Sequence, residues 1–422
     1  MSSQRIAIIG SGIAGLTTAR LLHEHYNIEV YEQNEVLGGH THTQDIEIDG
    51  TVYPVNTGFI VYNDWVYHNF NRLMAPLDVQ REATEMSFSV RDDASGLEYN
   101  GHNLDTLFAQ RRNFFRPSFW RMIRDILRFN KRSQADLDAG RLTPELTLGD
   151  YLRQGGYGQA FIHHYIIPMG AAIWSSGEAD MDAFPALFFV RFFKNHGLLS
   201  VKNRPQWYVI KGGSRAYIDP LIEPFRDKVH TLHRIERVER DADGVTLHFY
   251  NGHQERFDQV VFACHSDQAL ALLADPSDAE RQILSAIPYS QNEVVLHTDD
   301  SLLPKRRKAW AAWNYHLPKQ ADEAVGLTYN MNILQNFKDA PVTFCVTLNR
   351  TSEIAPDKII NRFNYAHPVF SKAGIEAQQD YHRIGNQNRS HFCGAYWFNG
   401  FHEDGVNSAL RVVRDLGVEP WQ

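Results

Sequence analysis

The stretch that decides the fold is RIAIIGSGIAGLTTARLLHEHYNIEVYE, residues 5–32. Its opening run, Arg5–Ile9, is apolar and predicts a buried strand, and the periodic residues Ile13–Glu24 predict a helix. A second apolar run, Ile28–Tyr31, predicts another strand. Two strands joined through a helix predict the beginning of a parallel sheet in an α/β fold.

Three glycines occupy the turn between the first strand and the helix. Gly10 permits a tight turn, Gly12 lets the backbone approach a pyrophosphate, and Gly15 allows the helix to lie close to the strand. The helix N-terminus then offers N–H groups and a positive dipole end to the phosphates. Glu32 follows the second strand, where a carboxylate accepts hydrogen bonds from ribose hydroxyls and disfavours a 2′-phosphate. This context predicts a dinucleotide cofactor other than NADP.

Two further features favour FAD over NAD. Gly38-Gly39 closely follow the ribose acid, so a second loop is able to pass near the cofactor. Near the other end of the chain, a helix is predicted from Asn407 to Leu416, stopping at Gly417 and opened by Gly405. The N-terminal dipole of that helix would stabilise the flavin edge that becomes negative on reduction. The alternative is a surface helix capped by Asp404 or Asn407.

Length and composition limit the class of protein. A chain of 422 residues exceeds what one hydrophobic core usually serves, so two joined domains are expected. Hydrophobic residues (43%) and charged residues (22%) occur in the proportions of a soluble globular protein, which excludes disorder. The formal charge of −8 argues against nucleic acid as a partner. Cys264, Cys345 and Cys393 are far apart and odd in number, as expected in a reducing compartment without disulfides.

The predicted organisation is a Rossmann-like FAD-binding domain interleaved with an α+β substrate domain. The FAD-binding domain takes residues 1–99, 205–274 and 389–422, and the substrate domain takes 100–204 and 275–388. A chain that leaves and re-enters one domain is consistent with a binding site between the two.

The sequence predicts a cytoplasmic protein. A glycine-rich turn follows Ile6–Ile9, where a signal peptide would need an extended apolar core. The aromatic run Ala183–Phe193 is too short to span a bilayer. Peripheral contact with the inner membrane surface is left open by residues 107–132, which hold eight Lys or Arg and one Asp.

That basic segment has two interpretations. Its apolar residues recur at helical spacing: Phe119, Met122, Ile123, Ile126 and Leu127. A basic amphipathic helix suits a peripheral enzyme on anionic lipid, and the alternative is a helix packed on its own protein with a solvated basic side. The aromatic residues likewise either line a tunnel for an acyl chain or fill the core. They are Phe188, Phe189, Phe192, Phe193, Trp174, Trp310, Trp313 and Tyr315.

The histidines do not predict a metal site. His40 and His42 alternate along the chain, but a site needs a third ligand and a second shell, and nothing nearby supplies them. No Ser–His–Asp constellation or Gly-x-Ser-x-Gly elbow is recognisable. The sequence therefore assigns no catalytic residue, although His42 is a candidate to face the substrate.

Several of these motifs resemble those of a known superfamily. Residues 10–15, Glu32, Gly38-Gly39 and 404–406 resemble the superfamily of flavin-containing amine oxidases, protoporphyrinogen oxidases and phytoene desaturases. The chain is more similar still to bacterial NAD/FAD-binding oxidoreductases often encoded beside cyclopropane-fatty-acid-synthase-like methyltransferases, whose plant versions are fused to one. The motifs are GGHTHT (38–43), TGFIVYN (57–63), PMGAAIW (168–174), NHGLL (195–199) and FHEDG (401–405).

Carried over by position, the resemblance implies three groups of cofactor contacts. The pyrophosphate contacts are Ser11, Gly12, Ile13 and Ala14. The adenosine contacts are Glu32 and Gln33 at the ribose and the backbone of Val238 at the adenine. The contacts of the diphosphate, ribityl chain and flavin are Gly39, His40, Thr41, Thr57, Gly58, Phe59, Asp404, Gly405 and Val406.

The chain also departs from the amine oxidases. These usually have an arginine after the double glycine, where His40 stands here. Their acidic ribityl contact would fall near Gly394-Ala395, where there is no acid, and no lysine matches the one that they hold near flavin N5. These departures leave the FAD site in place and argue against amine oxidation.

The sequence therefore predicts an FAD-dependent oxidoreductase that transfers hydride from a substrate carbon to flavin N5, with the flavin carrying the chemistry. Family context and the basic segment favour a fatty acyl chain, free or in phospholipid, as substrate and a methyltransferase as partner. The alternatives are a flavin-containing amine oxidase, an NAD-linked dehydrogenase, and a non-catalytic flavoprotein that accompanies a fatty-acid methyltransferase.

Overall fold

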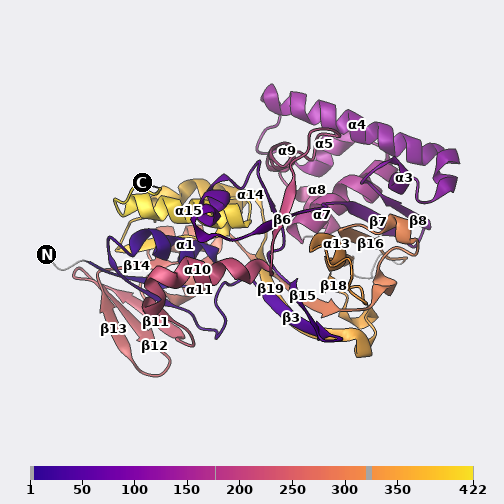
Figure 1. Ribbon diagram of the computed structural model, residues 1–422. Coiled ribbons are helices and arrows are strands. Elements are labelled where there is room, and N and C mark those ends of the chain that lie inside the picture. The colour runs from indigo at the N-terminus through magenta and orange to yellow at the C-terminus, as the bar shows by residue number, and fades with distance from the viewer. Residues whose placement is uncertain (1–3, 176, 320–325, 422) are drawn as a thin grey trace.

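The first strand lies inside a five-stranded parallel sheet, seen in the computed structural model, which describes residues 4–175, 177–319 and 326–421. The strand order is β10-β2-β1-β14-β20. These strands are β1 (Arg5–Ile9), β2 (Asn27–Tyr31), β10 (Val229–His230), β14 (Gln259–Phe262) and β20 (Ser390–Phe392). Three distant stretches of chain thus build one sheet, which lies at the end of the molecule that carries both termini (Figure 1).

The five-stranded sheet separates two cores because successive side chains of a strand point to opposite faces. Ile6 and Ile8 lie in the core with helices α1, α2, α10 and α15, whereas Ala7 and Ile9 lie in the core with a three-stranded sheet and α11, α12 and α14. The helices are α1 (Ile13–Leu22), α2 (His68–Met74), α10 (Ile218–Ile222), α11 (Ser266–Leu272), α12 (Asp278–Ser285), α14 (Lys372–Gln379) and α15 (His402–Asp415). The small sheet is β11 (Ile235–Arg240), β12 (Val245–Phe249) and β13 (Gln254–Phe257).

A mixed seven-stranded sheet forms the other half of the molecule, in the order β19-β15-β18-β17-β16-β7-β8. Among the strand pairs of the described residues, β16 and β7 alone run parallel within it. Its strands are β7 (Phe88–Asp92), β8 (Leu97–Asn100), β15 (Tyr289–His297), β16 (Trp313–Leu317), β17 (Gly326–Asn330), β18 (Cys345–Leu348) and β19 (Ile359–Pro368).

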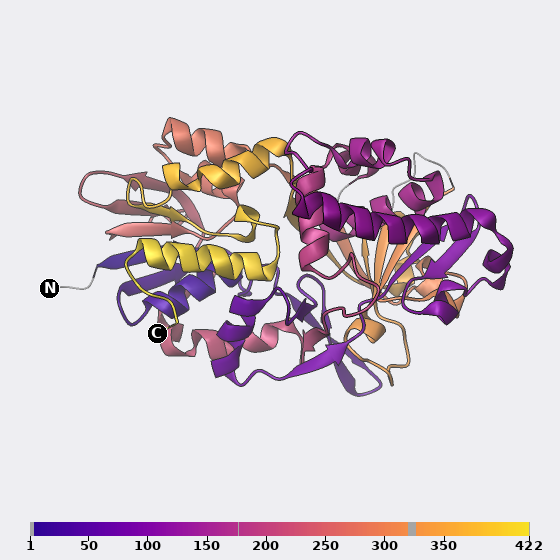
Figure 2. The same ribbon diagram turned by 90° about the horizontal axis from the view of Figure 1, so that it is seen from above.

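A helical layer covers one face of this sheet, and its core includes Val90, Tyr315 and Leu327 from the strands. The long helix α4 runs along the outside of the layer, away from both termini (Figures 1 and 2). The helices are α3 (Leu104–Leu107), α4 (Pro117–Asp138), α5 (Leu148–Gln154), α6 (Gln159–Phe161), α7 (Ile167–Trp174), α8 (Glu178–Ala183) and α9 (Ala186–Asn195), with a π-helical turn at Ile162–Ile166.

Short elements connect the two halves. The hairpin of β3 and β4 contributes Val55 to the core on the other face of the seven-stranded sheet. A further small sheet has the order β5-β9-β6. The remaining elements are β3 (Thr43–Ile48), β4 (Thr51–Asn56), β5 (Tyr62–Asn63), β6 (Arg81–Thr84), β9 (Trp207–Ile210) and α13 (Met331–Leu334), joined by short 3-10 turns.

The α/β fold class is confirmed, but several predicted boundaries need correction. Segment 1–99 already contains β7 and most of β8, which belong to the seven-stranded sheet. Helices α12 and α14 fall in segment 275–388, which was assigned to the substrate domain. They pack instead in a core of the five-stranded sheet. Strand β9 (Trp207–Ile210) falls in segment 205–274, which was assigned to the FAD-binding domain, yet it pairs with β5 and β6. Pairing joins residues far apart in sequence, so local patterns do not reveal it. The division into two interleaved domains stays a prediction.

The basic segment forms the predicted helix, but the apolar face of that helix is not free. In α4, Phe119, Met122 and Phe129 are buried in the core of the helical layer, and Ile123 and Ile126 pack against it. Trp174 and Phe189 lie in the same core. The helix therefore packs on its own protein and cannot lay this face on lipid. Over the described ranges, no helix has both the length and the hydropathy that a membrane crossing requires.

Candidate cofactor site

The glycine turn lies at the carboxyl end of β1, the edge of a parallel sheet where ligands bind. Gly10 has φ +108°, a conformation that L-residues rarely adopt, and a Cβ there would lie 2.9 Å from the Ala263 carbonyl oxygen. A Cβ at Gly15 would overlap the Gly10 carbonyl oxygen. At Gly12, by contrast, a Cβ would meet no atom within 4 Å, so this side of the turn is open.

The N-terminus of α1 is suited to bind an anion. Gly12 is its N-cap and supplies no side-chain cap, so no side chain occupies the capping position. Ile13 and Ala14 form the buried first turn. The open space at Gly12 and the positive end of the helix dipole together fit a pyrophosphate.

The Glu32 carboxylate is buried directly after β2 and is held by two neighbours. Ser11 donates to Oε2 from its backbone N–H (3.1 Å) and from Oγ (2.7 Å). Asn34 donates to Oε1 from its backbone N–H and from Nδ2, both at 2.9 Å. The acid is therefore fixed beside the glycine turn, in the position expected for a ribose contact. Gln33 is exposed and its predicted contact stays a prediction.

The double-glycine loop touches the first glycine turn. The Gly38 N–H donates to the Ser11 carbonyl oxygen at 3.1 Å, and a Cβ at Gly39 would lie 3.3 Å from the Cα of Gly12. His40 follows, and its Nε2 is buried without a hydrogen-bond partner among the described residues. A buried polar atom normally has a partner, so a bound cofactor group is a fitting occupant beside it.

Residues 57–59 lie against the histidine motif. The Phe59 N–H donates to the His40 carbonyl oxygen at 2.7 Å, and a Cβ at Gly58 would overlap that oxygen. The Thr57 N–H donates to the His42 carbonyl oxygen at 2.9 Å. These contacts place 57–59 directly beside the double-glycine loop, and a contact of this segment with flavin stays a prediction.

The last helix closes this group, although it begins five residues earlier than predicted, at His402. A Cβ at Gly405 would lie 2.6 Å from Cγ2 of Ile13, so the glycine lets α15 cross the first turn of α1. Val406 is fully buried in the same core. The sequence missed the true start because the N-cap is Phe401, which is not a capping residue type.

Asp404 caps its own helix from inside. Its Oδ2 accepts from the Phe401 N–H at 2.9 Å and its Oδ1 accepts from Asn399 Nδ2 at 3.2 Å. Burial raises the pKa of Asp404 to about 7. The capping role raised as an alternative is therefore present, and a contact of Asp404 with flavin stays a prediction.

Thr41 and Val238 have partners within the protein. Thr41 Oγ1 lies 2.5 Å from the Tyr217 hydroxyl and 2.9 Å from His402 Nε2. The His402 ring stacks on Phe59 with centroids 3.6 Å apart. The Val238 carbonyl accepts from the Ala274 N–H at 3.0 Å, and its side chain is buried. An adenine contact of Val238 stays a prediction.

Sequence reasoning missed a cluster of rings around His40, which we call the imidazole cluster: His40, His265, His367 and Tyr365. From His40, the ring centroids lie 5.9 Å away at His265, 5.6 Å at His367 and 5.2 Å at Tyr365. Burial lowers the pKa of His40 and His265 to about 4 and that of His367 to about 3, so these rings are neutral at neutral pH.

One signal could have indicated part of this cluster. His265 follows β14 and so lies at the same carboxyl edge as the glycine turn. Tyr365 and His367 alternate along β19, which reaches this edge from the other sheet, and no sequence pattern shows that approach. Among the described residues, no group of three or more His, Cys, Asp or Glu side chains is arranged to hold a metal.

His42, a candidate to face the substrate, belongs to a small polar network. Its Nδ1 lies 2.8 Å from Thr57 Oγ1 and 2.9 Å from the Tyr365 hydroxyl, and these two oxygens are 2.9 Å apart. Its Nε2 lies 3.0 Å from Gln44 Nε2. Both nitrogens of His42 therefore have partners within the protein.

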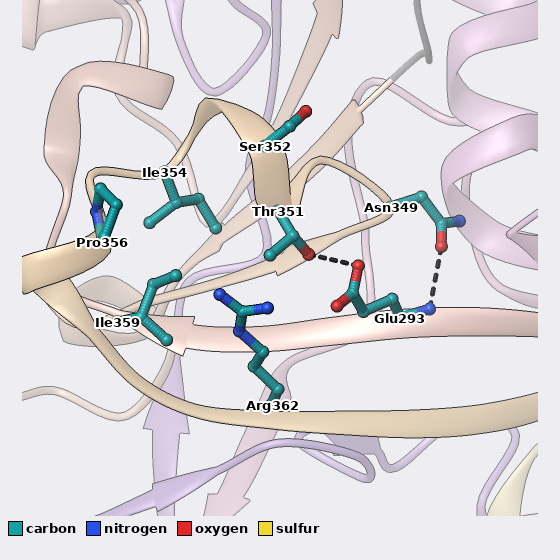
Figure 3. Close-up of a pocket in the computed structure, with 8 residues that line it drawn as sticks. All are labelled: Glu293, Asn349, Thr351, Ser352, Ile354, Pro356, Ile359 and Arg362. Atoms are coloured by element: carbon teal, nitrogen blue, oxygen red, sulfur yellow. Dashed lines mark hydrogen bonds between the residues drawn. The ribbon is translucent and has the colours of Figure 1, made fainter.

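A separate hollow of about 560 Å³ lies on the seven-stranded sheet (Figure 3). Within it Thr351 donates to the Glu293 carboxylate, and the Glu293 N–H donates to Asn349 Oδ1 at 3.0 Å. Its lining is Glu293, Asn349, Thr351, Ser352, Ile354, Pro356, Ile359 and Arg362. The hollow includes none of the predicted cofactor residues.

The fold and this site define an FAD-dependent oxidoreductase. The family model described as "Flavin containing amine oxidoreductase" matches residues 13–323. The chain belongs to this family, and FAD is its cofactor. No curated protein matches the chain.

Solved structures share the fold at low sequence identity. A fatty acid isomerase of P. acnes that produces CLA is 15% identical, with a TM-score of 0.69 over 97% of this chain and 98% of that one. Cyclohexylamine oxidase of Brevibacterium oxydans is also 15% identical, with a TM-score of 0.67 over 98% and 100%. A putrescine oxidase bound to putrescine is 14% identical, with a TM-score of 0.68 over 98% of each chain.

Proposed function

We propose that this oxidoreductase removes hydride from a carbon of a fatty acyl chain, free or within a phospholipid. When bound, the flavin supplies the hydride-accepting N5 atom. The residues proposed to hold the cofactor are those of the two glycine loops, Glu32, segment 57–59 and the start of α15. The protein binds and orients, and alignment of the reacting atoms at about 3–3.5 Å is where the rate gain arises.

The observation that supports an acyl substrate is that apolar side chains surround the N-terminus of α15. Phe401 packs against both the core of the five-stranded sheet and the core of the helical layer. Its ring stacks on Phe192 at 5.2 Å. Phe188 of α9 and Phe370, which follows β19, stack at 5.4 Å; Phe370 belongs to the core of the helical layer and Phe188 packs against it. An uncharged chain suits such surroundings better than a cation does.

The imidazole cluster gives the site a group that is able to accept a proton. Oxidation of a saturated C–C unit releases one hydride and, from the neighbouring carbon, one proton. The ring nitrogens of His265 and His367 are the proposed acceptors of that proton; burial keeps both imidazoles neutral and, by lowering their pKa, also makes them weaker bases than a free imidazole. We propose this pair as the proton acceptor, with Tyr365 positioned beside His40.

Amine oxidation is the second candidate, favoured by the family and by the cyclohexylamine and putrescine oxidases that share the fold. An ammonium substrate is best held by a carboxylate. The nearby Asp404 carboxyl caps its own helix, and that of Glu403 accepts from the Asn69 and Phe70 N–H groups. These contacts favour the acyl chain.

Two partners follow from an acyl substrate. A chain carried in phospholipid requires the protein to reach an anionic membrane, for which segment 107–132 is the candidate contact. The resemblance to proteins encoded beside fatty-acid methyltransferases supports such an enzyme as a partner that modifies the same chain. A protein that only accompanies the methyltransferase would bind FAD and resist reduction by lipid.

The test is an absorbance spectrum of the purified holoprotein, followed under anaerobic conditions by addition of bacterial lipid extract. Bleaching of the visible flavin band by lipid, and not by a panel of primary amines, is the expected result. Bleaching by amines, with hydrogen peroxide released in air, would establish the amine oxidase instead. A flavin band that no substrate bleaches would favour the accompanying role.

A further inference from the structure

The outer end of the helical layer exposes large apolar side chains among arginines and lysines. The exposed fractions are 88% for Phe115, 76% for Leu104, 52% for Leu127, 48% for Trp120 and 45% for Phe114. Exposed apolar side chains scattered singly are ordinary, but a group of them surrounded by one sign of charge marks an interaction site. We call the group of these five side chains and the basic residues around them the aromatic–basic surface.

Two segments far apart in sequence build this surface. Asp105 accepts from Arg111 Nη2 at 2.5 Å and from Lys308 Nζ at 2.7 Å. The second segment, 305–308, reads Lys-Arg-Arg-Lys, and all four residues are exposed. The surface therefore extends beyond segment 107–132, and its charge depends on the fold.

Helix α4 divides its residues between an inner and an outer side. Phe119, Met122 and Phe129 face the core. The exposed outer stripe lies at spacings of four, three and four residues, which fall on one face of a helix: Trp120, Arg124, Leu127 and Lys131. The stripe alternates an apolar group with a cation, so both kinds of contact are available from one face.

The cations on and beside the stripe are free to bind an external anion. Across the described residues, Arg116, Arg121, Arg124 and Lys131 form no ion pair, whereas Arg132 pairs with Asp136. Residues 103–132 and 305–308 hold twelve Lys or Arg and two Asp, in a chain whose formal charge is −8. The positive charge is thus concentrated at one end of a negative protein.

The aromatic groups are held in fixed positions. Phe114 stacks on Phe108 at 3.8 Å, and Trp120 Nε1 donates to the Phe114 carbonyl oxygen at 2.9 Å. Phe115, the next residue, is left pointing outward at 88% exposure. Aromatic rings beside cations are the combination that inserts at the headgroup level of an anionic bilayer.

We propose that the aromatic–basic surface docks the protein on an anionic lipid bilayer, with Phe115 inserted and the Arg124–Lys131 stripe on the headgroups. The role of this docking rests on the proposed acyl substrate, but binding to the bilayer does not depend on catalysis. The apolar face of α4 is buried and cannot contact lipid, so the protein binds the bilayer through the aromatic–basic surface.

The test is sedimentation of the holoprotein with vesicles at low salt. Vesicles of phosphatidylcholine with phosphatidylglycerol should bind the protein, and vesicles of phosphatidylcholine alone should not. Arg124→Gln with Lys131→Gln should weaken binding about 30-fold, since each cation near the surface contributes about 1 kcal/mol. Phe115→Ser should weaken it about tenfold. Arg281→Gln with Arg414→Gln is the matched control, because both residues are exposed and lie beside the five-stranded sheet.

Several results would overturn the proposal. Equal binding to both vesicle types, or retention of binding by the stripe variant, would exclude docking through this surface. A dimer by light scattering that Phe115→Ser dissociates, without vesicle binding, would assign the surface to a second copy. The visible flavin spectrum of each variant reports whether it folds. Vesicle binding without bleaching by lipid would exclude the acyl substrate and support the docking. Bleaching by lipid without vesicle binding would support the acyl substrate and exclude the docking.

Discussion

The two long amphipathic helices of the molecule, α15 and α4, use their polar residues in opposite ways. In α15, Glu403 and Asp404 are buried: Glu403 accepts from the backbone N–H groups of Asn69 and Phe70, and Asp404 accepts from that of Phe401. In α4, the outer stripe of Arg124 and Lys131 is exposed and unpaired among the described residues. A buried polar group fixes structure, because losing its partner costs free energy, whereas an exposed cation leaves folding almost unaffected and is free to act on something outside.

The largest expected effect breaks the contact on which α15 depends. Gly405→Val places a side chain against Ile13, because a Cβ at this position would lie only 2.6 Å from Cγ2 of Ile13. We expect the free energy of unfolding to fall by about 1–3 kcal/mol and the bound FAD to be lost, because α15 moves off α1. Thermal unfolding and the flavin absorbance measure both effects. Retention of FAD at full stability would show that the α1–α15 contact is not part of the cofactor site.

A smaller effect is expected at the ribose acid. Glu32→Gln keeps the shape but removes the charge that accepts from Ser11 and Asn34. We expect FAD affinity to fall about tenfold, near 1.4 kcal/mol, with little change in fold. Fluorescence titration of apoprotein with FAD measures it. Glu35→Gln, at an exposed position three residues away, is the control and should bind FAD as the wild type does.

A pH effect is expected from Asp404. Its pKa is raised by burial from 3.8 to about 7, so the folded state favours the protonated form. The stabilising contribution is complete below pH 3.8 and is lost as the pH rises through about 7. Asp404→Asn should therefore gain stability relative to wild type as the pH rises across that range. Denaturant unfolding of both proteins at several pH values gives the difference, and a difference that does not vary with pH would contradict the assignment.

The smallest effect is expected on the outer side of α4. Leu127→Ser removes an apolar side chain that is 52% exposed, so the free energy of unfolding should change by less than about 0.5 kcal/mol. Vesicle binding should still weaken. A large loss of stability would mean that Leu127 belongs to the core of the helical layer, and the contrast between the two helices would not hold.

The same contrast explains which features the sequence could predict. The strand–turn–helix around Gly10 and the position of Glu32 after β2 could be predicted because β1, α1 and β2 are contiguous and the glycines meet local geometric requirements, whereas the cofactor contacts stay predictions. The imidazole cluster was missed because His40, His265 and His367 meet only after two sheets have formed. The sheet membership of β7 was missed for the same reason, since alternation shows a strand but not its neighbour.

The packing of α15 on α1 has a consequence for biosynthesis. Gly405 fits against Ile13 but follows it by about 390 residues, so it leaves the ribosome long after the glycine turn does. The edge strand β20 is equally late. Until β20 and α15 have emerged, the nascent chain carries an incomplete cofactor site, so FAD capture should wait for these segments and the growing chain should depend on chaperones to shield its unpaired sheet edge.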